Sequence, residues 1–344
     1  SDVCSSDLKD KTEYTQSTMN QLIDRHKRVI KYLRLSVTDK CDLRCFYCMP
    51  KNFKDFEIPE HWLNFDEITQ IVRVFSSLGV SSVRLTGGEP LTRRNLPSLI
   101  SQLNQIPGID DFSLSTNALQ LRKQAVELKN AGITRTNISL DSLDPVRFKE
   151  ITNGPLEKVL DGIMAAKKAG LNPIKINMVV MKGVNHDEVD NMVRYCVENQ
   201  FILRFIETMP MGNSGREASN HYIDINTIKK QLTQKFDLVP GIVPGSGPAR
   251  YMKVAGTESH IGFITPISQH FCDTCNRVRL GVEGVLYMCL GQEHSINLRP
   301  FVRNGIDDSE LAKIIKNAIN MKPLKHDFND NPDNVNRIMS MTGG

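Results

Sequence analysis

Hydrophobic and polar positions from residue 31 onward form short apolar runs that alternate with amphipathic stretches. This rhythm is typical of parallel βα units, in which each buried strand is followed by a helix. The pattern predicts strands at residues 32–37, 82–86, 111–115, 135–140, 173–180 and 202–207. It also predicts intervening helices over residues 65–78 and 123–131. Glycines stand where such helices should end, at Gly79, Gly132 and Gly170.

The number of βα units suggests an open architecture. Six units are two fewer than a closed eight-stranded barrel contains, so we expect a partial TIM-type barrel with its site at the carboxyl ends of the strands. After Gly212 the rhythm changes to a helix at 225–236, a Pro- and Gly-rich stretch at 240–248 and short strands. The expected fold is therefore α/β, with a smaller C-terminal α+β domain. The expected divisions are an N-terminal tail at 1–29, the partial barrel at 30–218 and the C-terminal domain at 219–344.

Composition and charge narrow the class of protein only slightly. The chain has 344 residues, 40% of them hydrophobic and 24% charged, which excludes a disordered or fibrous protein. It has no apolar run of about 18 residues and no apolar stretch near its start, so we expect a cytoplasmic protein that does not engage a membrane. The net charge of +4 is dispersed, and it suits an anionic small substrate as well as a nucleic acid.

Six of the eight cysteines fall into two groups of three. Without a signal peptide, such grouping indicates metal ligation rather than disulfides. The first group, Cys41, Cys45 and Cys48, has the spacing C-x3-C-x2-C and directly follows the first predicted strand. Thiolates at this spacing can hold one [4Fe-4S] cluster and leave its fourth iron open. Structural zinc is the alternative, and it would need a fourth ligand such as His26 or His61.

A Gly-Gly-Glu-Pro sequence, at residues 87–90, ends the second predicted strand. Glycines at a strand end let the backbone approach a ligand closely, and Glu89 would receive an ammonium group, although Gly87-Gly88 alone would more often be a plain turn. Together with the cysteine spacing and Tyr47 before the third cysteine, this motif resembles the radical S-adenosylmethionine (SAM) enzymes. The resemblance implies that the methionyl group of SAM chelates the open iron, and that SAM is cleaved to a 5′-deoxyadenosyl radical.

The second cysteine group consists of Cys272, Cys275 and Cys289, with the spacing C-x2-C-x13-C. It again offers three ligands without a clear fourth, so the spacing alone allows either a second [4Fe-4S] cluster or an incomplete zinc ribbon. Arg277 and Arg279 alternate on a predicted strand and should project to one face beside this group.

The segment 272–279, with Cys289 and the terminal Gly343-Gly344, resembles the GTP 3′,8-cyclase family of radical SAM enzymes. The resemblance extends from about residue 31 to the end of the chain. It implies a lyase that converts GTP to (8S)-3′,8-cyclo-7,8-dihydroguanosine 5′-triphosphate, the first step of molybdenum cofactor biosynthesis. It further implies SAM and two [4Fe-4S] clusters as cofactors, a reductant such as flavodoxin or ferredoxin, a homodimer, and terminal glycines that enter the active site.

The same resemblance assigns individual contacts. Those to GTP fall on Arg34, Arg84, Ser115, Lys175, Arg277, Val278 and Arg279. Those to SAM fall on Tyr47, Gly88, Ser139 and Met209. No catalytic side chain is assigned, because the radical is generated at the first cluster.

Two positions complicate this assignment. The family usually has Thr-Thr-Asn-Gly where this chain has Ser115-Thr116-Asn117-Ala118. Alanine does not adopt a positive φ cheaply, so we expect the local turn to differ. Arg204 is either a further basic contact to GTP or the ion-pair partner of a carboxylate such as Glu207.

Two other functions remain as alternatives. Peptide-modifying radical enzymes with auxiliary clusters match the first half equally well, but they usually carry more cysteines in the second half. A cluster- or zinc-stabilised nucleic-acid-binding protein would need a basic stripe with aromatic residues. Because aromatic residues make up only 6% of the chain and its charge is dispersed, we expect no nucleic-acid partner.

Overall fold

The computed structural model describes residues 21–50, 52–54, 56–245 and 247–343. All six predicted strands are present, each with bounds within one residue of the prediction. They are β1 (Tyr32–Ser36), β2 (Ser82–Thr86), β3 (Asp111–Thr116), β4 (Arg135–Ser139), β5 (Ile174–Val179) and β6 (Ile202–Ile206). Each pairs in parallel with the next along the chain, as expected for successive βα units.

Strands from the last third of the chain extend this sheet at both edges. β10 (Arg277–Leu280) pairs in parallel with β1, and β9 (His260–Ile264) pairs in parallel with β6. Antiparallel strands then complete the edges: β11 (Val285–Tyr287) and β12 (Ser295–Asn297) beyond β10, and β8 (Arg250–Val254) and β7 (Leu238–Pro240) beyond β9. In the described part of the chain, the strand order therefore runs from β12 to β7 through one twelve-stranded sheet. The α/β class is confirmed, whereas the six-unit partial barrel and the separate C-terminal domain stay predictions.

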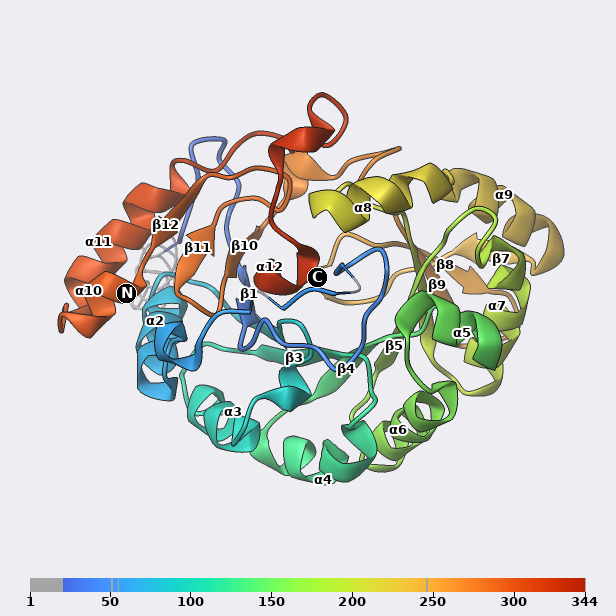
Figure 1. Ribbon diagram of the computed structural model, residues 1–344, viewed down its shortest axis with the longest axis horizontal. Helices are drawn as coiled ribbons and strands as arrows, with labels where there is room; N and C mark the ends of the chain where they lie inside the picture. The colour runs from blue at the N-terminus through green and yellow to red at the C-terminus, as the bar shows by residue number, and fades with distance from the viewer. Residues whose placement is uncertain (1–20, 51, 55, 246, 344) are drawn as a thin grey trace, which may run out of the picture.

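Helices surround the curved sheet (Figure 1). Those between the six parallel strands are α2 (Phe65–Ser77), α3 (Leu96–Asn104), α4 (Leu121–Ala131), α5 (Pro145–Thr152), α6 (Leu156–Lys168) and α7 (Val189–Glu198). Later helices are α8 (Gly212–Ala218), α9 (Ile225–Lys235), α10 (Arg299–Arg303), α11 (Asp308–Ile319) and α12 (Met339–Thr342). Single 3-10 turns lie at Pro59–His61, Pro90–Thr92, His186–Glu188, Ser219–His221, Cys272–Thr274 and Pro332–Asn334. The predicted helices are confirmed as α2, α4 and α9.

Local sequence signals explain where these helices begin and end. Asn64 and Glu67 form a reciprocal capping box that satisfies free N–H groups at the start of α2. The three glycines predicted to end helices have positive φ, at 87° for Gly79, 124° for Gly132 and 75° for Gly170. Glycine adopts this conformation without the steric penalty of a side chain, so the chain can turn back toward the next strand.

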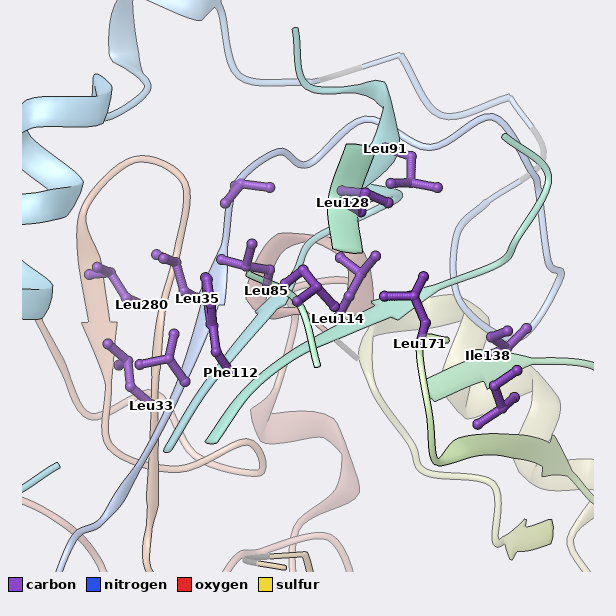
Figure 2. Close-up of a cluster of buried hydrophobic side chains, with 14 of the residues drawn as sticks. Leu33, Leu35, Leu85, Leu91, Phe112, Leu114, Leu128, Ile138, Leu171 and Leu280 are labelled. Carbon is purple, nitrogen blue, oxygen red and sulfur yellow. The ribbon is translucent and has the colours of Figure 1, made fainter. Parts of the chain in front are cut away.

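Apolar side chains from neighbouring strands pack into one core between the sheet and its helices (Figure 2). Leu33, Leu85, Leu114 and Ile138 are fully buried. Burial of each such side chain stabilises the fold by about 1.5–3 kcal/mol. Successive strand residues point to opposite faces, so the residues between these leucines face the interior of the curved sheet. This alternation places Arg34 and Arg84 on the inner face of β1 and β2, and serine and asparagine residues on that of β3 and β4.

Part of the expected N-terminal tail is also described. Ile23 forms an antiparallel bridge with Val29, and Leu22 is 1% exposed and donates its N–H to the carbonyl of Leu78. Residues 1–20 lie outside the described residues. No helix in the described ranges combines the length and the apolar character that crossing a membrane requires.

Candidate active site

Two adjoining cavities, of about 200 Å³ and about 170 Å³, lie inside the curved sheet. The first includes the carboxyl ends of β2 to β6, the edge at which the strand pattern predicts a site. The second lies beside β1, β2 and β10. The two share four lining residues, Ser115, Asn177, Ile206 and Met209. A ligand in one cavity is therefore adjacent to a ligand in the other.

The first cysteine group lines the first cavity. Burial raises the pKa of all three thiols, that of Cys48 to about 12 and those of Cys41 and Cys45 further. The carboxylates of Glu89 and Asp141 raise these pKa values as well. Thiolates at these positions therefore need a nearby positive charge, which bound metal supplies.

The Gly-Gly turn lies directly against the start of the cysteine loop. A Cβ atom at Gly87 would overlap the carbonyl oxygen of Thr38, and one at Gly88 would overlap that of Lys40. The Gly88 N–H donates to the Thr38 carbonyl at 2.8 Å, and the Glu89 N–H donates to the Lys40 carbonyl at 2.8 Å. Only glycine permits this approach, so the motif fixes the loop beside the cavity.

The structure gives Glu89 several partners within the protein. Its side chain is 1% exposed and does not line either cavity. Its carboxylate accepts hydrogen bonds from the Thr116 hydroxyl at 2.7 Å, the Asn117 N–H at 2.7 Å and the Leu91 N–H at 3.1 Å. Burial raises its pKa to about 8. Glu89 therefore ties the Gly-Gly turn to the turn after β3, and its contact with a ligand's ammonium group stays a prediction.

That second turn also differs from expectation. Ala118 adopts the left-handed conformation, with φ at 64°, so the prediction that alanine would alter the turn is wrong. The conformation costs roughly 1–2 kcal/mol, and it is stabilised locally by an N–H of Ala118 that donates to the Thr116 hydroxyl at 3.0 Å. Ala118 is fully buried. Its carbonyl packs so closely on α6 that a Cβ atom at Gly162 would overlap it.

The four residues expected to contact SAM all line the first cavity: Tyr47, Gly88, Ser139 and Met209. The Tyr47 hydroxyl donates to Asp141 at 2.7 Å, and the other oxygen of Asp141 accepts the Val179 N–H at 2.9 Å. Burial raises the pKa of Asp141 to about 6. Sequence reasoning missed Asp141, although its place just beyond β4 was an available signal.

Six of the seven residues expected to contact GTP line the second cavity: Arg34, Arg84, Ser115, Arg277, Val278 and Arg279. In the strand register, Arg34 lies beside Arg84 on β2 and beside Arg279 on β10. The aromatic ring of Tyr32 lies 5.3 Å from the Arg84 guanidinium and 5.8 Å from that of Arg277.

Lys175 does not line either cavity. It lies near the start of β5 and is 4% exposed. Burial lowers its pKa to about 7, and the positive charges of Arg204, Arg135 and Arg84 lower it further. Lys175 therefore lies behind the lining of the second cavity, in the electrostatic field of Arg84 and Arg204, which line it.

Positive charge dominates the second cavity. Five arginines and Lys322 line it, and among the described residues no aspartate or glutamate does. Burial lowers the pKa of Arg84 to about 9, and the charges of Arg34, Arg204 and Arg135 act in the same direction. Uncompensated buried cations favour an anionic ligand with several charges.

The structure also decides the pairing of Arg204. Its guanidinium donates to the Asn137 side chain at 2.5 Å, so the expected ion pair with Glu207 is wrong. Glu207 instead accepts the N–H groups of Ile267 at 2.9 Å and Ser268 at 3.1 Å. Within the described ranges, the Nε atoms of Arg204 and Arg277 are buried without a hydrogen-bond partner. Both atoms belong to residues that line the second cavity, which fits a ligand with several acceptor atoms.

The C-terminal segment extends to the arginines that line the second cavity. α12 lies near the centre of the molecule (Figure 1). Beyond it, the carbonyl of Gly343 accepts hydrogen bonds from Arg34, at 3.3 Å, and from Arg279. Arg279 also donates to the Thr342 carbonyl at 3.3 Å. Gly343 therefore lies between two arginines of the second cavity, while Gly344 is outside the described residues.

The second cysteine group lines the second cavity. Burial acts to raise the pKa of Cys275, but the pKa is lowered on balance, because the charges of Lys322, Arg277 and Arg28 and a backbone hydrogen bond from Arg277 together outweigh burial. Burial raises the pKa values of Cys272 and Cys289. Among the described residues, no three His, Cys, Asp or Glu side chains are arranged to hold a single metal ion.

Neither histidine considered as a fourth zinc ligand lies at the first cysteine group. His26 and His61 do not line the first cavity. His26 instead accepts a hydrogen bond from Arg25 at 3.1 Å, and His61 lies 3.0 Å from the carboxylate of Glu57.

Comparisons with known proteins show which families share this fold. The family model described as the Radical SAM superfamily matches residues 35–196, and the one described as Molybdenum Cofactor Synthesis C matches residues 201–328. A solved structure of Streptococcus suis SuiB bound to its precursor peptide SuiA has a TM-score of 0.60 at 16% identity. The match covers 87% of this chain and 67% of SuiB, and it shows the shared fold. The fold and the cysteine loop thus define a radical SAM protein.

Curated relatives narrow this class. A GTP 3′,8-cyclase of Hydrogenovibrio crunogenus is 47% identical, with 94% of this chain and 99% of the relative covered. GTP 3′,8-cyclase 1 of Pseudomonas aeruginosa is 44% identical, with 95% and 100% covered. One from Petrotoga mobilis is 42% identical, with 94% and 100% covered. The chain belongs to the GTP 3′,8-cyclase family.

Proposed function

We propose that this chain is a lyase that converts GTP to (8S)-3′,8-cyclo-7,8-dihydroguanosine 5′-triphosphate in molybdenum cofactor biosynthesis. Membership of the family supports this proposal. The observation that carries it is the pair of adjoining cavities, each lined by three cysteines, with five arginines and no described carboxylate lining the second. Such a space suits a triphosphate held beside a radical source.

The first cavity is the proposed place for a [4Fe-4S] cluster and SAM. Cys41, Cys45 and Cys48 offer three thiol ligands, which leaves one iron for SAM. The side-chain oxygens of Asn177 and Thr208 are buried without partners among the described residues, and both residues line this cavity, so they are available to a polar ligand. When bound, the cluster and SAM supply one-electron reduction and a carbon radical.

The SAM contacts have distinct tasks in this proposal. Tyr47, held by Asp141, and Ser139 flank the ligand, and the backbone of Gly88 meets its amino group. Met209 lines both cavities and separates SAM from GTP. Because these groups are fixed by strands and buried hydrogen bonds, they orient the reacting carbon and exclude water.

GTP is the proposed ligand of the second cavity. Its phosphates contact Arg34 and Arg84 and are attracted by the charge of Lys175. Its base lies toward the second cysteine group and contacts Ser115, Val278 and the arginines of β10. Guanidinium groups suit phosphate oxygens because each offers several donors in one plane. The cysteines of this group are proposed to hold a second [4Fe-4S] cluster. The ribose then lies between the cavities, near the SAM site.

Three further features stay predictions. They are the reductant, such as flavodoxin or ferredoxin, the homodimer and the cytoplasmic location that the resemblance implies.

Product analysis tests the proposed function. The chain is reconstituted anaerobically with iron and sulfide and then incubated with SAM, dithionite and GTP. We expect 5′-deoxyadenosine and cyclised GTP by chromatography with mass spectrometry, and neither product when SAM is omitted. Release of 5′-deoxyadenosine with GTP recovered unchanged would contradict the proposed reaction.

A further inference from the structure

Lys322 is a buried lysine without an assigned role. It follows α11, is 2% exposed and lines the second cavity. Its ammonium donates to the carbonyl of Arg277 at 2.9 Å and to the carbonyl of Met288 at 2.7 Å. Arg277 lies two residues after Cys275, and Met288 directly precedes Cys289. One ammonium group therefore connects the two chain segments that carry these cysteines.

The charge of Lys322 calls for a partner of opposite sign. Burying an ammonium group is costly unless it is paired, and two carbonyl acceptors satisfy only two of its three N–H donors. No described carboxylate lines the cavity at this point. The acidic groups nearest to these acceptors along the chain are cysteines, because the two carbonyls that accept from Lys322 lie within two residues of Cys275 and Cys289, and both cysteines line the same cavity.

Arg28 is a second buried cation near these cysteines, and it differs from Lys322 in how its charge is paired. Arg28 donates to the carbonyl of Cys272 at 2.8 Å, so it also holds the cysteine loop. Its charge, however, is neutralised by an ion pair with Asp24 at 2.6 Å. Arg28 thus has an acidic partner of its own, whereas the acceptors of Lys322 among the described residues are two neutral carbonyls.

We propose that Lys322 is a positioning residue of the second iron–sulfur site, which joins the segments carrying Cys275 and Cys289 and compensates the negative charge of their thiolates. This inference rests on the second cluster proposed above. A cluster gains negative charge on reduction, so a fixed ammonium beside it stabilises the reduced form. Lys322 therefore raises the reduction potential of the second cluster and slows its loss.

Substitutions can separate the charge from the hydrogen bonds. Lys322→Gln keeps an N–H donor but removes the charge, Lys322→Met removes both, and Lys322→Arg keeps the charge. Lys316→Gln, on the exposed side of α11, is the matched control. All are made in the full chain with Cys41, Cys45 and Cys48 changed to Ala, so that bound iron and its paramagnetic signal come from the second group alone.

The measurements are iron retention under a chelator and the midpoint potential from a redox titration followed by electron paramagnetic resonance. We expect a lower potential for Lys322→Gln, several-fold faster iron loss for Lys322→Met, and near-parental values for Lys322→Arg and Lys316→Gln. The readouts do not require turnover, so a general loss of activity cannot imitate them.

Two failures can be told apart. If the parent chain binds no iron at the second group, the proposed second cluster is wrong, whatever Lys322 does. If the parent binds iron and Lys322→Gln retains both its potential and its iron, the role of Lys322 is overturned. Should Lys322→Met not fold, the Lys322→Gln variant decides the question, because it preserves a hydrogen bond.

Discussion

The two cysteine groups offer the same three ligands in opposite electrostatic surroundings. The charges that act on the first group come from the carboxylates of Asp141 and Glu89, and they raise the pKa values of its thiols. The second group lies among cations, and Lys322 and Arg277 lower the pKa of Cys275. Ligand count alone therefore does not set the task of a cysteine site.

The difference extends to what each cavity can bind. The first is enclosed by a Gly-Gly turn and polar side chains at strand ends, which suits a small ligand with several polar groups, such as SAM. The second is lined by five arginines, which suits a triphosphate. We infer that the first group generates the radical and that the second anchors the substrate.

Removing either group tests whether both are iron sites. Two [4Fe-4S] clusters correspond to about eight irons per chain after anaerobic reconstitution. Changing Cys41, Cys45 and Cys48 to Ala should remove about half of this iron, and changing Cys272, Cys275 and Cys289 should remove the other half. Metal analysis measures both. An unaltered iron content in the second variant, or bound zinc at either group, would contradict the assignment of two iron–sulfur sites.

Lys175→Ala tests the cationic side of the comparison. The substitution removes a buried charge behind the lining of the second cavity, so it acts on GTP through Coulomb attraction and should weaken binding by about 1–3 kcal/mol. Isothermal calorimetry measures the affinity, with Lys168→Ala, an exposed lysine of α6, as the control. If both variants bind GTP like the parent, Lys175 takes no part in the site.

Gly162→Ala should disturb the turn after β3, where Thr116 and Asn117 line the first cavity. The added Cβ would overlap the carbonyl of Ala118, whose turn holds Glu89 through Thr116 and Asn117, so we expect about 1–3 kcal/mol of destabilisation. Gly247→Ala is the control, because a Cβ there meets nothing within 4 Å. Denaturant unfolding measures stability. Equal free energies of unfolding for the two variants would show that the turn at Ala118 can shift without a measurable cost.

The pH dependence of GTP binding should be smaller. Burial lowers the folded-state pKa of Lys175 to about 7. Its side chain is therefore charged below this pH and loses its proton as the pH rises through it. GTP favours the charged form, and affinity should therefore fall by several-fold between about pH 6.5 and 8.5, with proton uptake on binding. Lys175→Ala should show a shallower dependence. Identical pH profiles for the two proteins would exclude this titration.

The fold was predictable as far as local patterns reach. Buried parallel strands are continuous apolar runs, so β1 to β6 were located within one residue. The pairing of β1 with β10, which aligns Leu33 with Val278, was not predictable because no local signal connects segments so far apart. This pairing is what brings the second cysteine group to the parallel sheet.

The candidate site was predictable where it depends on motifs. The cysteines and the arginines carry recognisable spacing, and the structure gathers them around two cavities. Asp141, Lys322 and the internal role of Glu89 depend on hydrogen bonds that form only in the folded chain. Ala118 was misjudged because packing against α6 compensates a backbone conformation that alanine disfavours.

The division of roles between the two groups is the central claim, and two single variants test it directly. Cys45→Ala and Cys275→Ala are reconstituted in parallel and incubated with SAM, GTP and dithionite, and 5′-deoxyadenosine and cyclised nucleotide are quantified by chromatography. Cyclisation requires two carbons held close together, so a loosened anchor should harm it far more than radical initiation. We expect Cys45→Ala to form neither product, and Cys275→Ala to form 5′-deoxyadenosine without cyclised nucleotide. Normal cyclisation by Cys275→Ala, or 5′-deoxyadenosine from Cys45→Ala, would contradict the account.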